Sequence, residues 1–313
     1  MGASVVVLCG GVGAARFLEG VVRAVDAEAV TAIVNVADDA EFHGLHVSPD
    51  IDTVLYTLAG IVDPAQGWGV RGDTHVLQAA LARLGRDTWF QLGDRDIATH
   101  IHRTALLREG VTLTEITARL ARSLGVRARI LPSSDERQAT MVRTDDGWLA
   151  FQEYFVHRRQ QDTVREVRFD GPGTPAPGVL DAIAGASVVL VAPSNPIVSI
   201  GPILAIAGVR DALSRTPAPV VAISPIVGGE ALKGPAAAML ASLGHEVSPV
   251  GVARMYADFL DAMVLDERDA ALASSVESAG PRAIVAATIM RDLASKEQLA
   301  RIAIDAATAR ADA

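Results

Sequence analysis

The residues that could do chemistry in this chain fall into four short segments, each placed where an apolar run ends. They are residues 9–16, residues 38–39 together with 49–53, residues 92–96 and residues 192–196. In open α/β sheets, ligands bind beyond the carboxyl ends of the strands, so segments of this kind meet at one edge of the sheet. Together they predict a single site that handles phosphate and metal.

The first segment is a glycine-rich turn that predicts a phosphate site. Gly11 and Gly13 follow a β-rich run and precede a helical pattern, so their amides and the helix N-terminus would bind an anion. Arg16 stands where a dinucleotide fingerprint has its third glycine, and no Walker-type Gly-Lys-Ser/Thr follows. We predict that Gly11, Gly13 and Arg16 hold a diphosphate. The alternative is a tight turn with a purely structural role.

Carboxylates in the second segment predict a metal site. Asp38 and Asp39 end an apolar run, and Asp50 and Asp52 are separated by one residue at an expected helix start. Such hard oxygen ligands hold Mg²⁺ while substrate phosphates fill its other positions. Asp50 could equally be a helix cap, because the helix dipole stabilises a carboxylate there. Convergence near the glycine turn favours Asp38, Asp50 and Asp52 as metal ligands, with Asp50 or Asp52 as the catalytic residue.

The third and fourth segments predict residues that bind the substrates. Asp94 and Arg95 precede an expected helix that carries His100, and we predict that all three face the cleft. The alternative is an N-cap with a surface ion pair. Ser194 and Asn195 lie between two prolines that hold an extended loop. Their hydroxyl and amide groups suit recognition of a nucleobase or ribose.

The elements that must position these segments alternate along the chain. Strands and helices in turn imply a single α/β domain over 1–313, with a doubly wound, mostly parallel, Rossmann-like sheet. A helical insertion is expected at about 94–124, and a hairpin and strand insertion at about 138–169. The hairpin strands are expected at 139–143 and 148–156, and the further strand at 164–169. Expected strands cover 4–9, 31–36, 187–191, 219–224, 262–266 and 283–289, and expected helices cover 14–25, 50–59, 74–84, 234–243 and 296–308, with a further helix inside 201–213.

Composition excludes several classes of protein. The 313 residues carry a net charge of −9, which repels nucleic acid, and no run of Lys or Arg offsets it. No apolar run reaches the roughly 20 residues that a membrane helix needs. Cys9 is the only cysteine, so no intrachain disulfide can form, which fits a reducing cytoplasm. Cys9 ends an expected strand and is predicted to be a core residue.

In combination, the segments resemble the 2-phospho-L-lactate transferase family of coenzyme F-420 biosynthesis, including its actinobacterial phosphoenolpyruvate transferase members. The distinctive strings are 48–53, 92–100, 132–136 and 193–203. The resemblance implies that the ribityl hydroxyl of the deazaflavin Fo attacks the phosphorus that bears a three-carbon acid in a guanosine diphospho donor. GMP then leaves, Mg²⁺ is required, and the protein is expected to be a homodimer.

The resemblance also implies roles for the residues. The glycine turn and Arg16 would cradle the diphosphate. Asp50 or Asp52 would hold the metal or accept the hydroxyl proton. Asp94 and Arg95 would orient Fo or the acid, while the loop at 194–195 would bind the guanosine end. The donor acid, whether phospholactate, phosphoenolpyruvate or phosphoglycerate, stays open.

Three rivals to this function remain. An NAD(P)-dependent oxidoreductase needs a glycine where Arg16 stands. A nucleotide-binding protein without catalytic activity, or a relative that lost Fo binding, leaves the carboxylates Asp50, Asp52 and Asp94 without a task.

Overall fold

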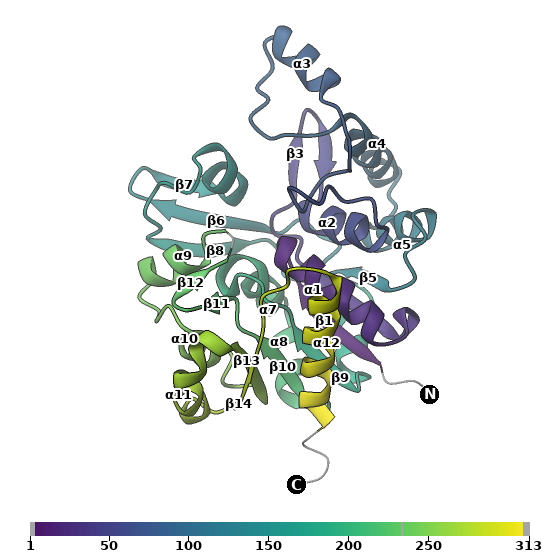
Figure 1. Cartoon of the computed structure of the whole chain (residues 1–313). Coiled ribbons are helices and arrows are strands. Elements are labelled where there is room, and N and C mark those ends of the chain that lie inside the picture. Colours follow the sequence, from purple (N-terminus) through teal and green to yellow (C-terminus); the bar gives the residue numbers. More distant parts are fainter. Residues whose placement is uncertain (1–3, 233, 309–313) are drawn as a thin grey trace.

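A seven-stranded sheet forms the centre of the molecule (Figure 1). The computed structural model describes residues 4–232 and 234–308. All neighbouring strands of this sheet are parallel, which confirms the α/β prediction. In spatial order the strands are β14 (Arg282–Ala286), β13 (Ala262–Asp266), β10 (Val220–Ile223), β9 (Val188–Val191), β1 (Val5–Cys9), β2 (Val30–Val34) and β5 (Arg129–Pro132).

Helices cover both faces of the sheet, as a doubly wound fold requires. β1 is buried along its whole length, so its apolar residues serve the core on both sides. The face that buries Val5, Val7 and Cys9 packs against α1 (Gly11–Ala24), α2 (Pro49–Leu58), α5 (Leu113–Ser123) and α12 (Leu293–Thr308). The other face packs against α6 (Val179–Ala184), α7 (Gly201–Ala205), α8 (Val209–Arg215), α9 (Ala236–Ser242), α10 (Pro249–Met255) and α11 (Ala273–Ser278).

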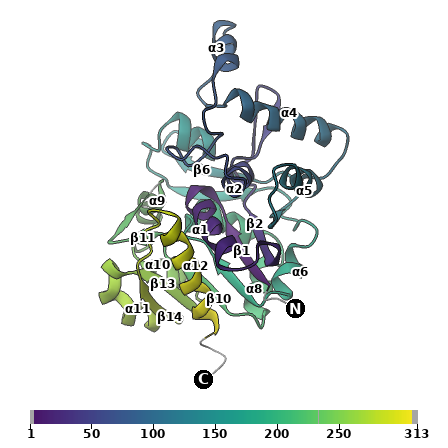
Figure 2. The ribbon, with the colours of Figure 1, turned by 45° about the vertical axis from the view of Figure 1, so that its right-hand side comes forward.

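The first and last helices lie side by side on their face of the sheet (Figure 2). Gly20 of α1 allows this approach, because a Cβ at that position would collide with the backbone carbonyl of Lys296 on α12. Cys9 is fully buried at the end of β1, and burial raises the pKa of its thiol. The prediction that Cys9 is a core residue is therefore confirmed.

The two blocks expected as insertions contain most of the elements predicted for them. The helical block holds α4 (Asp94–Arg108) and α5, whose Ile116 and Leu120 reach the core. The second block holds an antiparallel sheet in the order β7 (Gly147–Ala150), β6 (Ala139–Thr144) and β8 (Glu166–Asp170). Gly147, with φ of +119°, completes the turn of the predicted hairpin.

The expected strand at 148–156 is wrong beyond Ala150. The chain turns into a helical segment, of which Glu153–His157 is π-helical. Phe151 and Phe155, four residues apart, stack with ring centroids 5.4 Å apart, and Tyr154 is buried next to them. These aromatic side chains follow a helical period rather than the alternation of a strand.

Strand β5 was not expected from the sequence. Its four residues include an exposed Arg129 and end at Pro132, a composition that only an edge strand tolerates. The smaller elements are β3 (Ala40–Phe42), β4 (Leu45–Val47), α3 (Val76–Arg83), β11 (Ile226–Val227) and β12 (Glu230–Ala231), with 3₁₀ helices at Ala27–Ala29 and Glu267–Leu272 and a π-helical turn at Pro196–Ile200.

Across the described parts of the chain, no single helix is long and apolar enough to cross a membrane. A pair of short helical segments, Pro196–Ala205 and Val209–Arg215, reaches the required length and composition only when both are taken together across an 88° bend. Ile203, Leu204 and Val209 of this pair are buried in the protein core.

Candidate functional site

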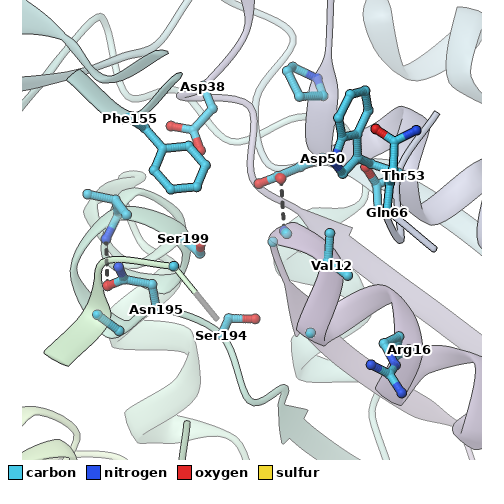
Figure 3. A pocket seen from close by; sticks show the side chains of 18 of the residues that line it. Val12, Arg16, Asp38, Asp50, Thr53, Gln66, Phe155, Ser194, Asn195 and Ser199 are labelled. Carbon is cyan, nitrogen blue, oxygen red and sulfur yellow. Dashed lines mark hydrogen bonds between the residues drawn. The ribbon is translucent and has the colours of Figure 1, made fainter. Parts of the chain in front are cut away.

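The four segments meet in one cavity of about 770 Å³ at the carboxyl ends of the central strands. The glycine turn after β1, the acids of residues 38–52, the start of α4 and the loop after β9 all contribute to its wall. Figure 3 shows Asp38 and Asp50 across the same open space, with Ser194 and Val12 nearby. The predicted convergence is therefore confirmed for these segments.

The glycine turn has the geometry of an anion site. Gly11 adopts φ of +77° as α1 begins, and a Cβ on Gly13 would lie only 2.8 Å from the carbonyl oxygen of Pro193. The helix N-terminus therefore approaches the loop after β9 very closely. Arg16 lines the cavity and donates to the carbonyl of Met290. Its position suits contact with a bound phosphate.

Asp38 and Asp50 form a buried acid pair. Asp50 is 7% exposed and accepts hydrogen bonds from the amide of Gly11 at 2.8 Å and from Nδ2 of Asn35 at 3.0 Å. Burial outweighs these bonds and raises the pKa of Asp50 to about 6. Burial and then the neighbouring charge of Asp50 raise the pKa of Asp38 well above its usual range. Oδ1 of Asp38 has no hydrogen-bond partner among the described residues.

This pair has the chemistry of a magnesium site. Two buried carboxylates that repel each other and keep a free oxygen are stabilised by a divalent cation between them. The cavity beside them leaves room for substrate oxygens to complete the coordination. Asp38 and Asp50 therefore fit Mg²⁺.

Asp52 is held differently, although it lies one turn into the same helix. Both of its carboxylate oxygens accept hydrogen bonds from the fully buried guanidinium of Arg103. An arginine that engages both oxygens leaves little coordinating capacity for a metal. Asp39 also has a side-chain partner, because its Oδ2 lies 3.0 Å from Nε2 of His46. The geometry thus favours Asp38 and Asp50 over Asp52 as metal ligands.

The predicted binding residues of α4 separate into two groups. Asp94 and Arg95 are not among the described residues that line the cavity, whereas Asp96 and His100 are. The Asp94 carboxylate accepts hydrogen bonds from the hydroxyl of Thr74 and the first amides of α3, and these bonds lower its pKa. Asp94 thus holds the start of a neighbouring helix, which is neither the predicted cleft position nor the alternative of an N-cap on its own helix. His100 lines the cavity, as predicted.

The loop after β9 also divides its two predicted binding residues. Ser194 is 6% exposed, and its hydroxyl has no partner among the residues described. Asn195 uses its carbonyl oxygen to cap the following helical turn, accepting from the amides of Ile197 and Val198. Ser194 is therefore the freer of the two for a ligand.

Sequence reasoning missed the apolar wall of the cavity and the buried Arg103. Aromatic and aliphatic side chains line the cavity beyond the acid pair; they include Val47, Trp68, Phe90, Leu92, Phe151 and Phe155. Apart from Phe151 and Phe155, they come from loops and short segments, where no periodic pattern marks them. Arg103 gave a weak signal, because it lies three residues after His100 on the same helix face.

Comparison with known proteins identifies the family. A family model described as 2-phospho-L-lactate transferase CofD matches residues 5–303. The chain belongs to this family. It is 42% identical to a 2-phospho-L-lactate transferase of Methanothermobacter thermautotrophicus, covering 95% of this chain and 96% of that protein. It is 44% identical to a phosphoenolpyruvate transferase of Streptomyces avermitilis, covering 96% and 97% of the two chains. The protein is accordingly a transferase, and the resemblance seen in the sequence is confirmed.

A solved structure supports the fold. A member of the UPF0052 family from Bacillus halodurans aligns with a TM-score of 0.61 at 16% identity, covering 96% of this chain and 99% of that one. This likeness extends over the sheet and its helices and speaks for the architecture alone.

Proposed function

We propose that the protein transfers a phospho-three-carbon-acid group, 2-phospholactate or phosphoenolpyruvate, from a guanosine diphospho donor to the ribityl hydroxyl of Fo. GMP is released, and the product belongs to coenzyme F-420 biosynthesis. The observation that carries this proposal is the acid pair Asp38–Asp50 between a glycine turn and an apolar wall in one cavity. Relatives named for transfer of either acid support the same reaction class.

The donor fits the end of the cavity formed by the glycine turn. The amides at the start of α1 and the guanidinium of Arg16 offer positive charge to a diphosphate. Arg16 and His100 are the basic side chains on the wall among the residues described. The free hydroxyl of Ser194 lies near enough to the turn to contact the guanosine end, and GDP or GMP would occupy this same region.

The acceptor fits the apolar end. A deazaflavin ring is flat and largely apolar, so it would lie against aromatic side chains such as Trp68, Phe90 and Phe155. Trp68 is 38% exposed at the cavity. Its ring is therefore available for contact with a ligand. The ribityl chain would then extend from this wall toward the acid pair.

Mg²⁺ would be held by Asp38 and Asp50, where it would neutralise charge on the diphosphate. Phosphoryl transfer depends mainly on positioning and charge neutralisation. The hydroxyl oxygen of Fo forms a bond to the phosphorus that bears the acid, and the bond from that phosphorus to the bridging oxygen breaks. GMP leaves with the bridging oxygen. A carboxylate of this acid pair would accept the hydroxyl proton.

The oligomeric state and the cellular compartment of the protein are also proposed. A homodimer in a reducing cytoplasm accords with the family resemblance and with the single buried Cys9. Analytical ultracentrifugation of the purified protein would show a species of twice the chain mass.

The decisive experiment supplies the purified protein with Fo, Mg²⁺ and each guanosine diphospho donor in turn. The proposal expects a deazaflavin phosphodiester and GMP, both detected by chromatography and mass spectrometry. Fo is fluorescent, so its binding is titrated in parallel, with and without GDP. Absence of Fo binding under all these conditions would reject the proposed acceptor, whatever donor is used.

A further inference from the structure

Arg103 is a fully buried cation behind the cavity wall, where it contacts two residues that line the cavity, Asp52 and His100. Its Nη1 lies 3.0 Å from Oδ2 of Asp52, and its Nη2 contacts the other oxygen of that carboxylate. Nη1 also lies 3.3 Å from Nδ1 of His100. A buried charge is strongly unfavourable unless it is paired and hydrogen-bonded. Arg103 therefore depends on these two partners, and they depend on it.

The contact with Arg103 bears on the tautomer of His100. A guanidinium has donors but no acceptor, so Nδ1 of His100 must accept the hydrogen bond. The ring proton then resides on Nε2, which lies 3.3 Å from Oδ1 of Asp96. The hydroxyl of Tyr56 donates to the same carboxylate oxygen at 2.8 Å. His100 thus lines the cavity with Nδ1 turned to Arg103, while its Nε2 lies near Asp96 without a hydrogen-bond partner among the described residues.

The same residues would otherwise make a second cation site. Asp52, Asp96 and His100 are all buried and offer ligand atoms within 4.8 Å of one another. Such a set of two carboxylates and an imidazole suits a transition metal. Arg103 donates hydrogen bonds to both oxygens of Asp52. Its positive charge therefore takes the place that a metal ion would have there.

We propose that Arg103 is a positioning residue that acts as an internal cation. It keeps the set of Asp52, Asp96 and His100 closed to metal, and it fixes His100 as the neutral Nε2–H tautomer that faces the substrates. The divalent cation is thereby confined to Asp38 and Asp50. This role rests on the proposed function, because the cation that Arg103 directs is the one used in the transfer.

Binding of Mn²⁺ to the purified protein, followed by electron paramagnetic resonance, tests the exclusion of metal. We expect one Mn²⁺ per chain in the wild type and in Arg103→Lys, which keeps the charge, and a second Mn²⁺ in Arg103→Met. Arg108→Met is the matched control, since Arg108 is exposed on the same helix, and it should bind as the wild type does. Equal numbers in the wild type and Arg103→Met would overturn the proposal.

The tautomer of His100 supplies a second test, which is read from the wild-type protein. A long-range ¹H–¹⁵N spectrum of the wild-type protein, assigned with His100→Gln, should show a protonated Nε2 and an unprotonated Nδ1 near neutral pH. A protonated Nδ1 would overturn the proposal. If the wild type bound no Mn²⁺ while the tautomer was as expected, the cation in the proposed function would fail and the contact of Arg103 with His100 would stand.

Discussion

The backbone amide of Gly11 donates a hydrogen bond of 2.8 Å to Oδ1 of Asp50, which joins the first turn of α1 to the first turn of α2. A Cβ on Gly10 would lie 2.8 Å from the other oxygen of the same carboxylate. The turn proposed to bind phosphate and the acid proposed to bind Mg²⁺ are therefore fixed against each other. Any substitution that moves one of them displaces the other.

Replacing Asp50 tests its place at the centre of the site. Asp50→Asn retains an acceptor for Gly11 but loses the charge for Mg²⁺ and the proton acceptor. Turnover should fall by about 10²-fold or more, with the fold intact by circular dichroism. Asp181→Asn is the control, because Asp181 is an exposed first-turn acid of α6. A similar loss in both variants would contradict the special role of Asp50.

The acid pair makes stability depend on pH and on Mg²⁺. A carboxyl whose folded pKa is raised favours the protonated form, so the metal-free protein loses stability as pH rises from the ordinary Asp range of about 4 through about 6. Mg²⁺, bound to the ionised pair as proposed, would offset this loss. Differential scanning fluorimetry should show a larger Mg²⁺-induced rise in melting temperature at pH 7.5 than at pH 5. Equal rises at both pH values would count against the pair as the metal site.

Replacing Asp38 should separate stability from function. Asp38→Asn removes one of two buried carboxylates that repel each other, so the metal-free variant should melt at a higher temperature than the wild type at pH 7.5. The same variant should lose most of its Mg²⁺-dependent stabilisation and its turnover. A drop in the melting temperature of the metal-free variant would show that Asp38 is balanced by a partner other than a metal.

Closing the space at Gly13 tests the glycine turn. A Cβ at this position would meet the carbonyl oxygen of Pro193 at 2.8 Å, so Gly13→Ala must push the turn away from the loop after β9. A misplacement of about 1 Å in a binding group can cost about 10²-fold in rate. Steady-state kinetics with the donor varied would measure the loss in kcat/KM. Gly185→Ala is the control, because Gly185 lies at the exposed end of α6. Unchanged kinetics in Gly13→Ala would place the diphosphate elsewhere.

At Asp94 the observed geometry differs from the sequence prediction of a substrate-binding residue. Its carboxylate holds the start of α3, so Asp94→Ala should lower the melting temperature and leave turnover at 20 °C nearly unchanged. Thermal melts and initial rates on the same preparation would check both. If turnover collapsed while the melting temperature held, Asp94 would bind substrate as the sequence predicts.

Local pattern and composition were sufficient to predict the frame of the molecule. Buried parallel strands such as β1 and β9 are continuous apolar runs, and the polar residues that follow them must gather at one edge of the sheet. This rule placed Gly11, Asp38 and Asp50 in one site before any contact was known. The prediction of strands from apolar runs failed at β5, because an edge strand tolerates a charge and a proline. It also failed at 151–157, where aromatic residues follow a helical period.

Tertiary structure alone decided which of the candidate groups are free to react. Asp50 and Asp52 look alike in the sequence, but successive helix positions turn by about 100°, so only Asp52 reaches Arg103, 51 residues away along the chain. By the same rotation Asp96 lines the cavity while Asp94 caps α3. Such pairings depend on how distant helices pack, and a single sequence carries no local signal for them.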